Sequence, residues 1–256
     1  MNRLRLALLA LIATVTIIAQ AAVPKLPDEH LRYRVMFKWG LINKKAGQAD
    51  MTLRFDAATD TYTATVYARS EPWADRVYSL RDTLTTVMGR HDLAPLRYER
   101  RAHEHGRYEW DQIAFTRNKE IFTAECIHRR RRKNETELSE KRTYLEAEGM
   151  TVDFISAFFY LRMLEFTKML PDHTVTINIF SGKRKELLQF TFKGIESVKV
   201  GDVRQNAFKV EFKFTSDGKK NTSDPITAWI STDKQRVPLL IEGKLPIGKI
   251  KCELDR

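Results

Sequence analysis

The sequence predicts a mainly β protein: one long antiparallel meander, curled into an open barrel, a half barrel or a spiral, with one buried apolar helix at about residues 153–168. Three observations support this prediction. Apolar residues recur at every second position in several segments, turn-forming residues separate these segments at short spacing, and one segment has a helical distribution of apolar residues. Many short, evenly separated strands are typical of a closed or curled sheet.

The first 21 residues have the features of a cleavable secretory signal peptide. Two arginines precede an apolar stretch at residues 6–18, and an Ala-Gln-Ala sequence supplies the small residues that signal peptidase requires. This stretch is shorter than the roughly 20 residues that span a bilayer, which disfavours an uncleaved anchor helix. We therefore expect a single β-rich domain at residues 22–256, located in the periplasm. No cysteine lies near the cleavage site, so we expect no lipid anchor.

The expected mature chain is basic. Cleavage removes two arginines and no acids, so the net charge falls from +11 to +9. A secreted basic protein encounters anionic lipids and glycans of the envelope rather than nucleic acid. We therefore expect an anionic envelope surface, and no nucleic acid, among its partners.

The alternating segments predict strands with one apolar and one polar face, as in an antiparallel sheet. The clearest alternation occurs at residues 31–39, 49–56, 187–194, 207–214 and 248–254. Turn-forming residues are expected to join strands at residues 58–60, 105–106, 118–119, 181–182, 201–202 and 217–218.

A basic run lies between two predicted strands, at residues 120–128 and 136–146. Its alternation would send charges to both faces of the sheet, so neither face could be buried there. We therefore predict a solvated β-hairpin that projects beyond the sheet. Its tip would hold five basic residues: Arg129, Arg130, Arg131, Arg132 and Lys133.

The predicted helix has a clear beginning and end. Asp153 can cap its N-terminus, and Pro171 lies just beyond its C-terminus. Its apolar residues nearly encircle it, which indicates burial on most sides. Two interpretations remain open: the helix fills the core of the curled sheet, or helix and sheet together enclose a cavity for an apolar ligand. The residues expected to line this core or cavity are Phe154, Phe158, Phe159, Arg162 and Phe166.

Two cysteines are present, and both lie in predicted strands. Cys126 shares a face with Phe122 and Ala124, and Cys252 shares a face with Ile250 and Leu254, so both thiols are expected to point inward. They would form a disulfide if these faces meet, or remain two buried thiols if they do not.

No catalytic motif is recognisable, and we expect neither an enzyme nor a cofactor. His103 and His105 have a spacing that metal sites use, but no third ligand is evident, so a solvated pair is the simpler interpretation. His128 is interpreted as a solvated residue at the sheet edge. A nucleophile elbow, a zinc-protease helix and a phosphate-binding loop are all absent from the sequence.

Four segments, in order, resemble bacterial secreted proteins grouped as domain of unknown function 3108. They are WGLINKKAGQA near the start, DLAPLRYE at residues 92–99, DFISAFFYLR at 153–162 and WISTDKQRVPLLIEGKLPIGKIKCEL at 229–254. The resemblance implies an envelope protein with a β-rich fold, similar in outline to the open barrels of periplasmic lipoprotein carriers. The matched positions are Gly47, Pro95, Asp153, Ser156, Arg162, Trp229, Ser231, Asp233, Arg236 and Pro238. Among them Arg162 would be buried, so it needs a partner such as Asp233 or a bound anion.

Two functional hypotheses follow. The protein could be a non-enzymatic envelope protein that binds or carries a lipid or acyl chain between the curled sheet and the helix. Alternatively, it could be a structural or interaction protein with a filled core that docks through a strand edge or its basic surface.

Overall fold

The computed structural model describes residues 26–216, 224–244 and 248–255. The predicted signal peptide and the predicted turn at residues 217–218 lie outside the described residues. The remaining predicted turns, at residues 58–60, 105–106, 118–119, 181–182 and 201–202, all join strands.

Fifteen strands form one continuous sheet. They are β1 (Glu29–Trp39), β2 (Ile42–Asp56), β3 (Thr61–Ser70), β4 (Leu80–Gly89), β5 (Pro95–Glu104), β6 (Arg107–Asn118), β7 (Ile121–Arg131), β8 (Ser139–Glu148), β9 (Thr151–Val152), β10 (Thr174–Phe180), β11 (Lys185–Val200), β12 (Val203–Ser216), β13 (Ile226–Ser231), β14 (Pro238–Lys244) and β15 (Lys249–Leu254). The helices are α2 (Pro72–Tyr78), α3 (Phe154–Met163) and the 3₁₀ turn η1 (Phe166–Lys168).

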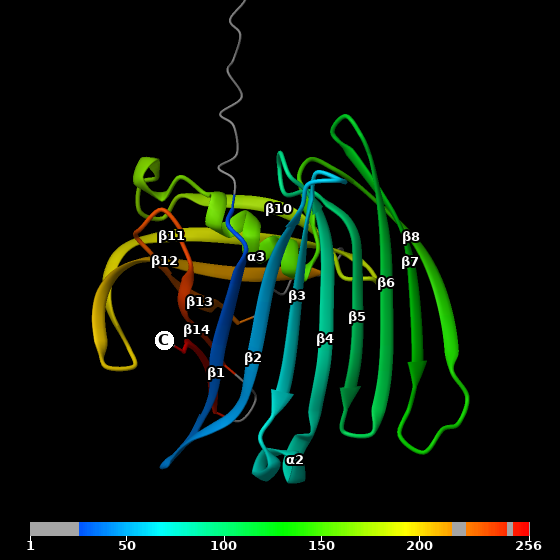
Figure 1. Ribbon diagram of the computed structural model, residues 1–256, viewed down its shortest axis with the longest axis horizontal. Helices are drawn as coiled ribbons and strands as arrows, with labels where there is room; N and C mark the ends of the chain where they lie inside the picture. Colours follow the sequence, from blue (N-terminus) through cyan, green and yellow to red (C-terminus); the bar gives the residue numbers. More distant parts are fainter. Residues whose placement is uncertain (1–25, 217–223, 245–247, 256) are drawn as a thin grey trace, which may run out of the picture.

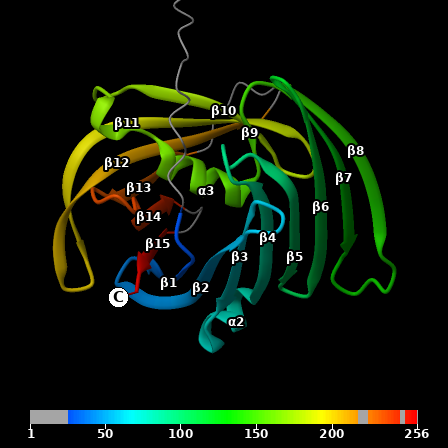
Figure 2. The ribbon, with the colours of Figure 1, turned by 45° about the horizontal axis from the view of Figure 1, so that its top comes forward.

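The strand order is β8-β7-β6-β5-β4-β3-β2-β1-β15-β14-β13-β12-β11-β10-β9. All neighbours are antiparallel except β9 and β10. The sheet curls strongly: β10–β12 cross over β1–β6, and α3 lies between the two halves (Figures 1 and 2). The prediction of a curled antiparallel meander around one buried helix is therefore confirmed. We call the side that faces α3 the concave face.

The pairing of β1 with β2 is interrupted by a bulge between Val35 and Met36. The additional residue of this bulge is Ala46 on β2, and the register of β1 with β15 is continuous. Trp39, at the end of β1, is exposed. Gly47, opposite Val35, allows the close approach of β2 and β3: a Cβ atom there would lie only 2.5 Å from the Arg69 carbonyl oxygen.

Helix α3 begins where the sequence predicts. The Asp153 carboxylate accepts hydrogen bonds from the backbone amides of Ile155 and Ser156, and the Ser156 hydroxyl accepts one from the Asp153 amide. Thr86 on β4 donates a further bond of 2.7 Å to the same carboxylate, which fixes the helix start to the sheet.

The predicted end of the helix at about residue 168 is wrong. The helix ends at Met163, because Leu164 adopts an extended backbone conformation. The chain then turns so that Phe166 packs between Phe192 and Phe208, with ring centroids 5.6 and 5.0 Å away. Packing of this ring into the second half of the sheet outweighs the local tendency to continue the helix.

Helix α2 was not predicted. It is only seven residues long and has no buried residue, so it carries no apolar periodicity. It is held at the sheet by Trp73, whose indole N–H donates to the Lys45 carbonyl at 2.7 Å. None of the helices in the described residues has the length and hydrophobicity needed to cross a membrane.

Candidate functional site

The predicted helix residues lie on the concave face, but in different environments. Phe159 and Phe166 are fully buried in core clusters and therefore belong to a filled core. Phe158 is partly buried, and Phe154 is 40% exposed. Phe159 and Phe166 thus fill part of the interior, whereas the rings of Phe154 and Phe158 are less completely covered by the rest of the protein.

Phe154 connects the two halves of the sheet. Its ring lies 6.5 Å from Tyr98 on β5 and 6.4 Å from Phe214 on β12. Phe214 in turn contacts Phe212 at 6.3 Å, and both of these rings are half-buried. We call Phe154, Phe158, Phe212 and Phe214 the half-buried rings. They form an apolar surface on the concave face that the described residues cover incompletely.

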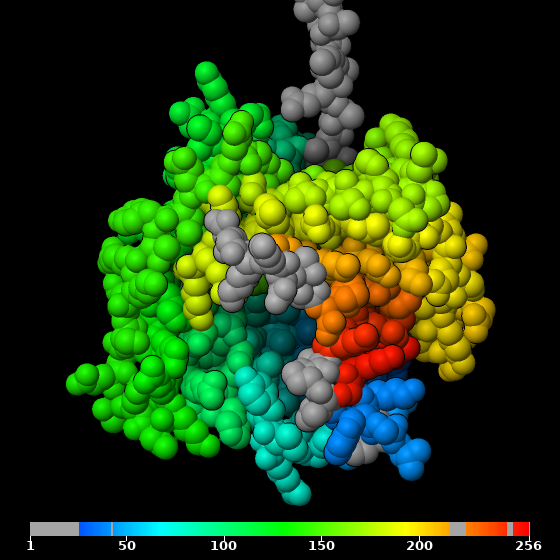
Figure 3. Space-filling view, turned by 180° about the vertical axis from the view of Figure 1, so that it is seen from behind, coloured from blue at the N-terminus to red at the C-terminus, as the bar shows by residue number. Residues whose placement is uncertain are grey.

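Seen from behind, the molecule is hollowed between the cyan and teal strands of its first half and the orange and red strands of its last third (Figure 3). A separate shallow groove of about 420 Å³ lies on the opposite, convex side of the sheet. It is lined by Ala114, Thr116, Thr123, Ala124, Glu125, Tyr144, Leu145 and Glu146.

Arg162 is buried, as predicted, but its predicted partner is wrong. Its guanidinium forms an ion pair with both carboxylate oxygens of Glu29 and donates two hydrogen bonds to the Gln235 carbonyl. Asp233 instead accepts hydrogen bonds from Ser231, Gln235 and Arg236 in its own turn. The Asp233 carboxylate is thus committed to shaping the turn that presents Gln235 to Arg162.

The matched residues near the C-terminus also hold the end of α3. The Arg236 guanidinium donates to the Leu164 carbonyl and lies over the rings of Phe166 and Phe208. Such cation–π contacts and the capped carbonyl fix the helix end to β12. The roles of Arg162, Asp233 and Arg236 are therefore architectural.

Of the two alternatives for the cysteines, the structure has two separate thiols: Cys126 and Cys252 are both free. Cys126 packs in the core of the first half, and Cys252 packs against a different cluster around Tyr33. Their strands, β7 and β15, are separated by the six strands β1–β6, and the two thiols pack in different clusters. Burial raises the pKa of the Cys126 thiol to about 12 and that of Cys252 to about 11.

The basic hairpin exists, but its tip is shorter than predicted. Strand β7 continues to Arg131, and Arg129 and Arg130 pair with Glu140 and Ser139 on β8. Arg129 is largely covered: it lies 4.5 Å from the Trp110 ring centroid and donates to Glu140 and Gln112. The turn itself carries Arg132 and Lys133, and both are exposed, as is Arg131 at the strand end.

Sequence reasoning missed a group of charged residues on the concave face. We call it the charged cluster; it consists of Asp82, Arg100, Glu104, Glu109, Asp111, His128 and Lys183. Glu109, Asp111 and the core residue Ile113 occupy successive alternate positions of β6. The two carboxylates therefore lie on the concave face, as Ile113 does. One feature of the sequence could have revealed this cluster: charged residues alternate along β5 and β6 on the same face as the buried apolar residues.

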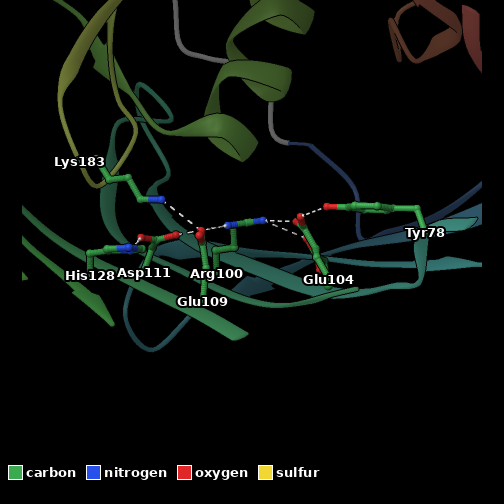
Figure 4. A network of polar contacts seen from close by, with 8 residues as sticks. Tyr78, Arg100, Glu104, Glu109, Asp111, His128 and Lys183 are labelled. Carbon is green, nitrogen blue, oxygen red and sulfur yellow. Dashed lines mark hydrogen bonds and ion pairs between the residues drawn. The ribbon is translucent and has the colours of Figure 1, made fainter. Parts of the chain in front are cut away.

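Arg100 is the centre of the charged cluster (Figure 4). One terminal nitrogen contacts Asp82 at 3.3 Å and Glu104 at 2.5 Å, and the other contacts Glu109 at 3.2 Å and Asp111 at 3.5 Å. These contacts make it the common partner of four carboxylates.

Lys183 belongs to the charged cluster although it lies on a distant turn, and Tyr78 contacts the cluster from α2. Lys183, from the β10–β11 turn, contacts Glu109 at 3.1 Å, and Gly182 allows this turn to lie directly over Asp111. Tyr78, at the end of α2, donates its hydroxyl to Glu104 at 2.5 Å. The cluster thus joins the two halves of the curled sheet.

His128 is not the solvated edge residue that the sequence suggested. It lies directly opposite Asp111 in the β6–β7 ladder, and its side chain is 14% exposed. Its Nδ1 atom is 2.6 Å from an Asp111 carboxylate oxygen, which is a hydrogen-bond distance. His103 and His105 instead contact the rings of Tyr108 and Tyr78, respectively.

The acidic groups differ in their protonation. Burial and the neighbouring Glu104 raise the pKa of Asp82 to about 6, although Arg100 opposes this shift. Burial would also raise the pKa of Glu109, but Lys183 and Arg100 hold it below its usual value. Asp82 therefore takes up a proton in mildly acidic solution while Glu109 remains ionised.

This architecture defines a class of protein: β-barrel-like proteins in which one curled sheet surrounds a helix. The chain belongs to the DUF3108 family, described as protein of unknown function, whose model matches residues 32–255. Its fold is similar to the crystal structure of a beta-barrel-like protein of domain of unknown function DUF1849 from Brucella abortus. The TM-score is 0.61 at 10% identity, over 91% of this chain and 97% of that one. No curated protein matches the sequence.

Proposed function

We propose that the protein is a non-enzymatic component of the periplasm or cell envelope that binds or carries an apolar ligand, such as a lipid or acyl chain. The ligand would lie between the curled sheet and α3. The observation that carries this proposal is the set of half-buried rings: Phe154 connects β5 to β12 and still leaves 40% of its surface exposed.

Physical reasoning favours an apolar ligand for this surface. Apolar area left in contact with water costs about 25 cal/mol per Å², and a large ring is usually covered when it lies inside a sheet. An acyl chain laid along Phe154, Phe158 and Phe214 would remove this area from water. The hollow seen from behind lies between the same two parts of the sheet (Figure 3).

Co-purification gives a direct test. The protein is purified from cells under native conditions, denatured, extracted with organic solvent and examined by mass spectrometry for bound lipid. The same protein is then delipidated and titrated with a fluorescent fatty acid, cis-parinaric acid. We expect a lipid in the extract and saturable fluorescence that a non-fluorescent fatty acid reverses.

A pair of substitutions ties binding to the concave face. Phe158→Trp adds volume beside the half-buried rings and should weaken cis-parinaric acid binding by about tenfold, since overpacking of about 1–3 kcal/mol opposes entry of a ligand. Tyr144→Trp, at a side chain that is 75% exposed on the convex side, serves as the matched control and should bind as wild type. A lipid-free extract with equal probe binding by both variants would instead favour a structural protein with a filled core.

A further inference from the structure

The charged cluster contains three side chains of the types that bind divalent metals. Asp111 and His128 are direct neighbours across β6 and β7, and Glu109 lies two residues before Asp111 on the same face. Their ligand atoms all lie within 4.8 Å of one another. A single ion about 2.0–2.2 Å from each atom would need only side-chain rotations, because the backbone already places them together.

Each of the three residues retains an atom for an ion. Glu109 contacts both Arg100 and Lys183 through Oε2, which leaves Oε1 without a partner among the described residues. Asp111 contacts Arg100 through Oδ2 and His128 through Oδ1. An ion would take the place of the proton between Asp111 Oδ1 and the His128 imidazole, while the contact of Oδ2 with Arg100 persists.

The charges within the cluster are unbalanced. Four carboxylates, those of Asp82, Glu104, Glu109 and Asp111, contact two permanent cations, Arg100 and Lys183. Unbalanced charge is expensive at positions with this little exposure, since the side chains of Asp82 and Asp111 are 9% and 5% exposed. One divalent cation supplies the two positive charges that the pairing lacks.

Two buried polar atoms in this part of the concave face have no partner among the described residues. Asp82 and Tyr98 are 6% and 1% exposed, and neither Asp82 Oδ1 nor the Tyr98 hydroxyl has a hydrogen-bond partner among the described residues. Both belong to this region: Asp82 contacts Arg100, and Tyr98 precedes Arg100 by two positions on the same face of β5. Buried polar atoms are almost always satisfied, so atoms without a protein partner indicate that water or a ligand enters this part of the concave face.

We propose that Glu109, Asp111 and His128 bind one divalent cation of the Zn²⁺ class on the concave face. The combination of one imidazole and two carboxylates suits Zn²⁺ better than Ca²⁺ or Mg²⁺, which prefer ligand sets made of oxygen alone. Three protein ligands leave at least one coordination position for water or for a polar group of a ligand. The proposal does not depend on the binding of an apolar ligand.

The test is a calorimetric titration of the chain, purified without an affinity tag and freed of metal with EDTA, with Zn²⁺. We expect one ion per chain and a rise in Tm on saturation. His128→Gln should weaken Zn²⁺ binding by at least about 100-fold, because loss of an outer-shell partner alone costs about 10–100-fold.

A matched control separates this site from surface binding. His91 is 83% exposed and lies 3.2 Å from Asp60, so it forms a histidine–carboxylate pair outside the charged cluster. His91→Gln should bind Zn²⁺ as wild type does. If His128→Gln fails to fold, as judged by circular dichroism, Glu109→Gln decides the question with the same expected loss. Zn²⁺ binding that is unmeasurable in the wild type, or equal in the wild type and the ligand variant, would overturn the proposal.

Discussion

Arg162 on α3 and Glu29 at the start of β1 form a buried ion pair, although they lie 133 residues apart in the sequence. Their side chains are 1% and 11% exposed, so each charge depends on the other for compensation. This pair joins the helix to the middle of the sheet.

Glu29→Gln should destabilise the protein by about 3–5 kcal/mol, because it leaves the Arg162 charge buried without a counter-charge. Urea unfolding followed by circular dichroism measures the loss. Asp28→Asn is the control: this neighbouring carboxylate pairs with Arg54 at the surface and should cost at most about 1 kcal/mol. Equal losses of unfolding free energy in the two variants would contradict the idea that burial makes the Glu29–Arg162 pair more important than a surface pair.

The raised pKa of Asp82 predicts that stability falls with rising pH. Between its ordinary value of 3.8 and about 6, the folded protein holds a proton that the unfolded chain has released. This contribution is present below pH 4 and is lost as the pH rises through 6, with a size on the order of 2–3 kcal/mol. Asp82→Asn should therefore gain stability relative to wild type between pH 4 and pH 7.

Urea titrations at several pH values, with EDTA present, measure this difference. Asp202→Asn, on an exposed turn, should keep the pH dependence of the wild type. Parallel pH profiles for wild type and Asp82→Asn would contradict the assignment of the proton to Asp82.

Both cysteines should be reduced and unreactive in the folded protein. Burial raises their thiol pKa values to about 12 and 11, so little thiolate exists at neutral pH. Iodoacetamide should label neither residue under native conditions and both after denaturation without reductant, as read by mass spectrometry. A denatured chain that accepts no label until it is reduced would instead demonstrate a disulfide.

The basic residues of the hairpin should separate into two groups. Arg129→Ser removes contacts to Trp110, Glu140 and Gln112 and should cost about 1–2 kcal/mol of stability. A serine substitution at Arg131, Arg132 and Lys133 together should change stability by less than about 0.5 kcal/mol.

The same triple variant tests the expected contact with an anionic envelope surface. It should lose affinity for vesicles that contain phosphatidylglycerol at low salt, as measured by co-sedimentation, because the three residues are exposed. Unchanged co-sedimentation would remove these residues from any membrane contact.

Strands β1, β2, β11, β12 and β15 were predictable because each carries its own alternation of apolar residues, and α3 because Asp153 marks its start. The end of α3 was not predictable, because it depends on where Phe166 finds space between Phe192 and Phe208. Local sequence contains no information about a pocket that other strands provide.

The charged cluster was beyond sequence reasoning for a similar reason. Lys183 and Glu109 are 74 residues apart and meet only because the β10–β11 turn folds over β6. His128 looked solvated because it precedes a run of arginines, whereas strand register places it opposite Asp111. The choice between a disulfide and two free thiols was left open for the same reason, since alternation shows which side a thiol faces but not which residue lies across from it.

The sheet order has a consequence for chain connectivity. Strands β1 and β15 are neighbours in the middle of the sheet, whereas its two edges, β8 and β9, are joined by only Gly149 and Met150. A circular permutant that links residue 255 to residue 26 and opens between Gly149 and Met150 would run from one edge strand to the other, each strand forming beside the one before it. In this permutant, the new chain ends would lie at the two edge strands, β8 and β9, instead of at the central strands β1 and β15.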